Sequence, residues 1–134
     1  MGSFTDFLEL EILDHVFGNA AYSAPATTYI GLSTTTITDA GGNITEPSGG
    51  SYARAAVTNN STNWPAASAG SKANGTTISF ATATGSWGTI LDFFLADASS
   101  GGNILAYGTL TTSKSVTSDD VAQFVAGALT ITLG

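Results

Sequence analysis

Residues 88–97 have the sequence GTILDFFLAD, which is longer and more apolar than the other strand-like stretches of the chain. A nearly continuous apolar run of this length is typical of a strand that is buried on both faces. The turn residues 99–103 (SSGGN) follow it, and residues 104–110 (ILAYGTL) again have strand character. We therefore predict a central strand at 88–97 and a neighbouring strand at 104–110, joined by a turn.

Shorter stretches rich in β-branched or alternating apolar residues occur on both sides of this pair. They are Thr27–Ser33, Tyr52–Thr58, Thr76–Thr82, Ser115–Thr117, Val121–Val125 and Ala128–Leu133. Short strands separated by turn residues are typical of sandwiches. The sequence therefore predicts an all-β fold, an antiparallel β-sandwich of jelly-roll type, preceded by a short N-terminal α-helix.

The predicted helix covers Phe4–Phe17. Ser3 is expected to cap its start, with Asp6 in a weak capping-box position, and Gly18-Asn19 is expected to end it. On this basis residues 1–18 form a helical docking segment and residues 19–134 a single β-sandwich domain.

The apolar residues of this helix do not form one stripe. At 100° per residue, Leu8, Ile12 and Val16 lie on one side, whereas Leu10, Leu13 and Phe17 lie on another. A helix that is apolar on two sides must be covered twice, once by its own domain and once by a partner. The alternative is a helix that lies deep in its own core. The residues expected at an oligomer or capsid interface are Phe4, Phe7, Leu8, Leu10, Ile12, Leu13, Val16, Phe17 and Trp64.

Two polar stretches, 34–50 and 59–75, are longer than most connections in compact domains, which indicates that they have a role. Trp64 lies in the second stretch. An exposed Trp64 would anchor a partner, whereas a buried one would pin the loop to its own sheet. We favour pinning slightly and keep Trp64 among the interface residues.

The composition excludes several kinds of partner. The chain of 134 residues has a net charge of −7, and its only basic residues are Arg54, Lys72 and Lys114. So few cations cannot neutralise a phosphate backbone or hold an anionic membrane, so we expect neither nucleic acid nor membrane as a partner. Charged residues are 10% of the chain. A polar but weakly charged surface is cheap to desolvate, which favours assembly with other proteins.

Residues suited to catalysis are sparse. The sole histidine, His15, adjoins Asp14 on the helix, and adjacent helix positions do not face each other. Asp92 and Asp97 are expected on opposite faces of a strand, and Asp119-Asp120 in a turn. The segment 39–46 does not match a calcium-loop spacing. We predict no catalytic residue, no metal site and no cofactor.

The chain resembles a family of small virion proteins of tailed bacteriophages that are often labelled tail-fibre-like. The resemblance covers most of the chain and rests on the order and spacing of its motifs. These are Ile12-Leu13-Asp14-His15-Val16-Phe17-Gly18, Tyr22, Ala24-Pro25-Ala26, Tyr29-Ile30-Gly31-Leu32, Gly50-Ser51-Tyr52-Ala53-Arg54 with Val57, Trp87-Gly88-Thr89-Ile90, Asp97-Ala98 and Gly101-Gly102-Asn103-Ile104-Leu105-Ala106-Tyr107-Gly108. The resemblance implies a structural virion protein.

A compact acidic chain without a shaft suits a capsid decoration, or cement, protein. We expect it on the outer surface of the capsid after assembly in the host cytoplasm, as a homotrimer that bridges copies of the major capsid protein. The alternative is a tail-fibre or baseplate module that binds a host glycan through Trp64, Asn59, Asn60 and Asn63. A glycan-cleaving enzyme is a third hypothesis, which lacks a convincing acid pair.

Overall fold

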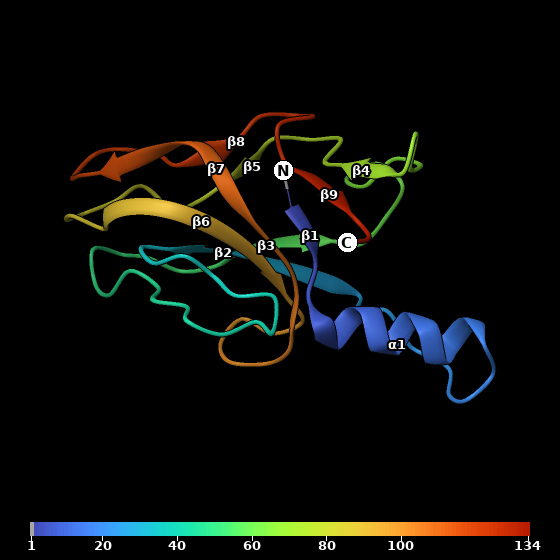
Figure 1. Ribbon diagram of the computed structural model, residues 1–134. Coiled ribbons are helices and arrows are strands. Elements are labelled where there is room, and N and C mark those ends of the chain that lie inside the picture. The colour runs from blue at the N-terminus through green and yellow to red at the C-terminus, as the bar shows by residue number, and fades with distance from the viewer. Residues whose placement is uncertain (1) are drawn as a thin grey trace.

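A computed structural model describes residues 2–134 and is dominated by strands (Figure 1). Its one helix is α1 (Asp6–Val16). The strands are β1 (Gly2–Phe4), β2 (Thr27–Ser33), β3 (Ala55–Thr58), β4 (Ser71–Ala73), β5 (Ile78–Ser79), β6 (Gly88–Ala96), β7 (Ile104–Val116), β8 (Gln123–Phe124) and β9 (Thr130–Thr132). The predicted all-β class with a short N-terminal helix is confirmed.

The strands form a curled seven-stranded sheet in the order β3-β2-β6-β7-β1-β9-β4 and a two-stranded sheet of β5 and β8. β6 pairs antiparallel with β2 on one side and with β7 on the other, which confirms the predicted central strand. The pairs of the large sheet are antiparallel except for β1 with β9, which run parallel. The large sheet is therefore mixed.

The main core lies between the two sheets. Ile30 of β2 and Phe93 of β6 belong to the same buried cluster as Ile78 of β5, with Phe124 of β8 packed against it. Phe94, the next residue on β6, faces the opposite side and joins a smaller cluster with Ile37. Because successive side chains of a strand point to opposite faces, Phe93 and Phe94 serve two cores. This explains why β6 is apolar almost throughout.

The N-terminal end of the chain departs from the sequence prediction. Ser3 does not cap a helix but lies in β1, opposite Tyr107 of β7, and α1 begins after Thr5. The physical reason is that Gly2–Phe4 fills the gap between β7 and β9 and pairs with both. Neither β7 nor β9 is near Gly2–Phe4 in sequence, so the local sequence pattern alone predicted that the helix begins two residues earlier, at Phe4.

Several strand bounds also differ from those predicted. The stretch Ser115–Thr117 is not a separate strand, since β7 continues without interruption to Val116. β4 lies inside the stretch 59–75 that had been assigned to a loop, where it pairs with β9. The predicted strands near 52, 76, 121 and 128 are shorter than expected, since β3, β5, β8 and β9 comprise only Ala55–Thr58, Ile78–Ser79, Gln123–Phe124 and Thr130–Thr132.

Candidate docking surface

The start of α1 is held firmly against the large sheet. Thr5 is fully buried, and its hydroxyl lies 2.5 Å from the carbonyl oxygen of Ile104. The Thr5 backbone N–H donates to the carbonyl of Leu105, and that of Asp6 donates to the carbonyl of Asp39. Thr5 therefore uses its hydroxyl to fasten the helix to β7 instead of capping it.

The far end of α1 extends beyond the sheet (Figure 1). Among the helices and strands of residues 2–134, only β1 and β7 contact α1. Leu8 is buried, whereas Leu10, Leu13, Val16 and Phe17 are 63%, 53%, 61% and 80% exposed. The alternative in which the helix lies deep in its own core therefore does not hold for its second half.

These four residues form what we call the exposed face of α1. Leu10, Leu13 and Phe17 are spaced i, i+3 and i+7, which places them on one side of a helix. Val16, which the sequence placed beside Leu8, is exposed because the helix has by then left the sheet. The predicted second covering of the helix is thus not supplied by the described part of the chain.

Trp64 pins its loop to the domain, as the sequence analysis favoured. Its side chain is partly buried and packs against the main core. The indole Nε1 is buried, and no atom within residues 2–134 accepts a hydrogen bond from it. Asn63 and Asn60 hold the same loop in place, since the Asn63 side chain donates to the Thr58 carbonyl and the Asn60 side chain accepts from the Asn63 N–H.

Trp64 also lines an apolar groove of about 640 Å³, which we call the Trp64 groove. Its apolar walls come mainly from the N-terminal segment, the Trp64 loop, β7 and the C-terminal segment, and Leu95 of β6 also lines it. The apolar residues that define it are Phe4, Leu8, Trp64, Leu105, Ile131 and Leu133. The structure therefore brings three predicted interface residues, Phe4, Leu8 and Trp64, together in one place. Phe7 and Ile12 are partly buried on α1.

Charge is distributed unevenly between these two features. The charged side chains of α1 other than His15 are all acidic, namely Asp6, Glu9, Glu11 and Asp14. Among residues 2–134, the only charged side chain that lines the Trp64 groove is a cation, Lys72 of β4. An acidic helix favours a neutral or basic partner surface, because like charges at an interface are costly.

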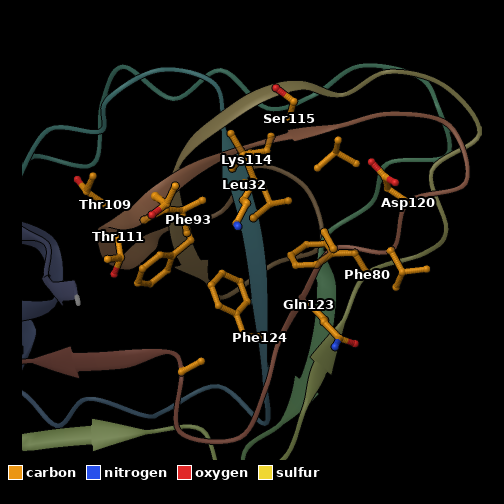
Figure 2. Close-up of a pocket in the computed structure, with 17 residues that line it drawn as sticks. Leu32, Phe80, Phe93, Thr109, Thr111, Lys114, Ser115, Asp120, Gln123 and Phe124 are labelled. Carbon is orange, nitrogen blue, oxygen red and sulfur yellow. The ribbon is translucent and has the colours of Figure 1, made fainter.

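A second hollow, of about 590 Å³, lies between β7 and the chain around β8 (Figure 2). Phe93 and Phe124 meet edge to face inside it, with ring centroids 5.5 Å apart. Polar residues line the hollow around them: Thr109, Thr111, Lys114, Ser115, Asp120 and Gln123. We call it the Phe124 hollow.

The Phe124 hollow owes its width to an irregularity of β7. Thr109 pairs with Asp92 and Lys114 with Ile90, so four residues of β7 stand opposite the single residue Leu91 of β6. Extra residues in one strand bend it away from its neighbour. The bend lifts this part of β7 from the sheet.

Most of the side chains that were weighed for chemistry are engaged in local contacts. Asp92 is buried, and its Oδ2 accepts the Ile37 N–H, whereas its Oδ1 has no hydrogen-bond partner within residues 2–134. His15 Nδ1 accepts the backbone N–H of Tyr22, and Asp97 accepts two hydrogen bonds from Asn103. Asp120 accepts from the backbone and hydroxyl of Thr117, as expected for a turn aspartate. Within residues 2–134 no three His, Cys, Asp or Glu residues are grouped as metal ligands would be, and no helix there is long and apolar enough to cross a membrane.

The motifs that carried the family resemblance form the scaffold of the domain. Arg54 makes a two-pronged ion pair with Glu46, with both N–O distances 3.0 Å, and donates to the carbonyls of Ala98 and Gly101. Tyr52 donates to Glu46 and accepts the Leu32 N–H. These contacts hold the long loop 34–50 against the β6–β7 turn. The residues of these motifs therefore stabilise the fold.

A comparison with protein families tests the resemblance that these motifs indicated. The sequence model of the family described as "Podophage GP4 fiber I protein gp80" matches residues 3–132 of the chain. The chain belongs to this family. None of the curated proteins matches it. Membership in the gp80 family confirms the resemblance to tail-fibre-like phage proteins and makes the chain a structural protein of the virion.

Sequence reasoning missed part of the surface. Lys72, Leu105, Ile131 and Leu133 line the Trp64 groove. Lys72 of β4 pairs directly with Ile131 of β9, and Leu105 of β7 is brought near them by β1, which lies between β7 and β9. The apolar character of the C-terminal stretch was visible, yet nothing local placed it beside Trp64. The same holds for the Phe124 hollow, which depends on a bulge that leaves no simple sequence pattern.

Proposed function

We propose that this chain is a non-enzymatic structural subunit of a bacteriophage particle, and that it attaches to neighbouring subunits through the exposed face of α1. The observation that carries the proposal is the exposure of Leu10, Leu13, Val16 and Phe17 on a helix whose start is anchored in the sheet. Covering a valine, leucine or phenylalanine side chain is worth about 1.5–3 kcal/mol, so these four residues supply a strong docking site.

The anchoring of α1 supports docking as its role. A helix held only by its own propensity would fray, whereas the buried Thr5 fixes the direction of α1 relative to β7. A preordered helix loses less conformational entropy on binding than a flexible segment does. The domain thus presents an apolar face in a defined orientation.

The first location that we propose is the outer surface of the capsid. There the chain would act as a decoration protein, as a trimer that bridges copies of the major capsid protein. The compact body of residues 2–134 and the low charge of the surface support this location. Many modest contacts that are repeated over a closed shell add up to a large stabilisation.

The second location is a tail fibre or baseplate, with a host glycan as ligand, and two observations favour it. The matching family is described as a fibre protein. The Phe124 hollow combines aromatic rings with hydroxyl, amide and carboxylate groups, which are the groups that bind sugars. The asparagines beside Trp64, proposed earlier for this role, are less suited because Asn60 and Asn63 bind their own loop.

Docking through α1 can be tested on particles that lack the chain. Purified wild-type protein and the variant Leu13→Asp/Phe17→Asp would be incubated with such particles, and bound protein would be measured after sedimentation. We expect the variant to bind at least about tenfold more weakly, because charge replaces buried apolar area. Equal binding of the two proteins would refute docking of α1 on the other proteins of the particle.

The number of copies per particle distinguishes the two locations. Hundreds of copies, from gel band intensities of purified virions, would support the capsid, whereas about six to twelve would support the tail, since few tail positions exist. A glycan array with the isolated protein, and with Phe124→Ser as a control for the Phe124 hollow, tests the glycan ligand directly.

A further inference from the structure

We propose that the neighbour that α1 docks on is a second copy of this chain, and that the exposed face of α1 of one copy occupies the Trp64 groove of the next. The inference rests on the proposed function and names the partner. It follows from two incomplete features of one chain, an apolar helix face without a cover and an apolar groove without an occupant, whose charges are opposite.

The form of the helix suits the groove. Leu10, Leu13 and Phe17 provide anchors at i, i+3 and i+7, which is the spacing with which helices enter apolar grooves. The groove has a volume of about 640 Å³, large enough to receive several side chains, and its walls include Trp64, Leu105 and Ile131. An aromatic wall of this kind is typical of an interface centre.

Electrostatics select a second copy in a specific orientation. Asp14 lies beside Leu10 on the helix surface, on the border of the exposed face, because positions i and i+4 are neighbours. Lys72 is the charged residue of the groove. The chain has three lysine and arginine residues. Arg54 is already paired with Glu46, and Lys114 lines the Phe124 hollow. Lys72 is therefore the cation suited to meet the acidic helix.

The helix cannot fill the groove of its own chain. Leu8, near the start of α1, already forms part of the groove wall, and the following turns lead away from the sheet. A protruding element and a recess at different positions of one molecule make a head-to-tail contact. Such contacts generate closed rings when the rotation between copies closes, which includes the trimer expected from the sequence.

The first test is the oligomeric state of the full chain by sedimentation velocity over a concentration series. We expect the wild type to associate, and Leu13→Asp and Lys72→Glu each to weaken association by about tenfold or more. The matched control is Lys114→Glu, which makes the same charge change in the Phe124 hollow and should leave association within about threefold of wild type. Circular dichroism checks that each variant is folded.

The decisive test is a charge exchange between the two surfaces. Lys72→Glu combined with Asp14→Lys restores opposite charges in the proposed contact, so association should return to within about threefold of wild type. A merely misfolded Lys72→Glu protein would not recover in this way. A wild type that stays monomeric at every concentration, a Lys114→Glu effect equal to that of Lys72→Glu, or a failure of the exchange to rescue would each overturn the proposal.

The particle-binding experiment separates this inference from the proposed function. Weak binding of the Leu13→Asp/Phe17→Asp variant to particles, together with a monomeric wild type, would leave docking through α1 intact and assign the groove partner to another virion protein. That outcome overturns the second copy as occupant. Normal particle binding by the same variant, together with a wild type that does not associate, would instead remove docking through α1, the function on which the inference rests.

Discussion

Gly31 of β2 lies directly opposite Phe94 of β6, and the phenylalanine ring occupies the space that a side chain on Gly31 would need. Phe94 is fully buried, and the guanidinium carbon of Arg54 lies 4.9 Å from the centre of its ring. The ring is therefore enclosed between the backbone of β2 and the Arg54 side chain.

Gly31→Ala should lower the free energy of unfolding by about 3 kcal/mol, because the added methyl group overpacks a rigid site. Chemical denaturation measures the change. Gly85→Ala is the control, since a Cβ at Gly85 would make ordinary contacts, with the nearest atom 3.6 Å away. A Gly31→Ala protein as stable as Gly85→Ala would show that the strands separate easily at this point.

Arg54→Lys should destabilise the domain by about 2–4 kcal/mol. Lysine cannot reproduce the two-pronged contact with Glu46 together with the bonds to Ala98 and Gly101, and the partly buried Glu46 carboxylate would lose one of its two contacts with residue 54. Lys114→Gln, at an exposed position of β7, is expected to change stability by less than about 0.5 kcal/mol. Equal effects of the two substitutions in urea denaturation would contradict this account.

Alkaline pH should destabilise the protein through Tyr52. Burial raises the pKa of Tyr52 above its ordinary value of 10.0, with Glu46 acting in the same direction. The folded state therefore retains the Tyr52 proton more tightly than the unfolded state. The contribution of Tyr52 to the free energy of unfolding is thus complete below about pH 10 and is lost as pH rises further. Melting temperatures measured from pH 8 to pH 11 should fall above pH 10, and the fall should be shallower in Tyr52→Phe.

Trp64→Phe should cost much less stability than Trp64→Ala. Phenylalanine keeps most of the packing against the core and removes the buried indole N–H, which has no acceptor within residues 2–134. We expect a change of less than about 1 kcal/mol for Trp64→Phe and a loss of about 3 kcal/mol for Trp64→Ala. Similar losses for both, by thermal denaturation, would indicate that the N–H has a partner in solution.

Leu8→Ala and Leu10→Ala make the same change on the buried and exposed sides of α1. Leu8 is 8% exposed and Leu10 is 63% exposed. Dilute protein carrying Leu8→Ala should lose about 2–3 kcal/mol of unfolding free energy, whereas Leu10→Ala should change it by less than about 0.5 kcal/mol. A large loss for Leu10→Ala at low concentration would mean that the exposed face is already covered within one chain.

Much of the fold followed from local pattern. The run GTILDFFLAD predicted β6 and its central place because a strand with two buried faces needs apolar residues at nearly every position. The helix was predicted together with its two apolar sides. Leu10, Leu13 and Phe17 lie on the side that the sheet does not cover, and they are therefore exposed. These features depend on neighbours close in sequence.

The remaining features depend on pairings between distant parts of the chain. The amino acid sequence by itself determined the all-β class, the central strand and the apolar surplus of the N-terminal helix, since periodicity and composition record them directly. Only the tertiary structure decided that Gly2–Phe4 is a strand between β7 and β9 and that Lys72 and Ile131 stand beside Trp64. Strand pairing is set by backbone hydrogen bonds, which are common to all residues except proline, so side-chain patterns do not specify which distant strands meet.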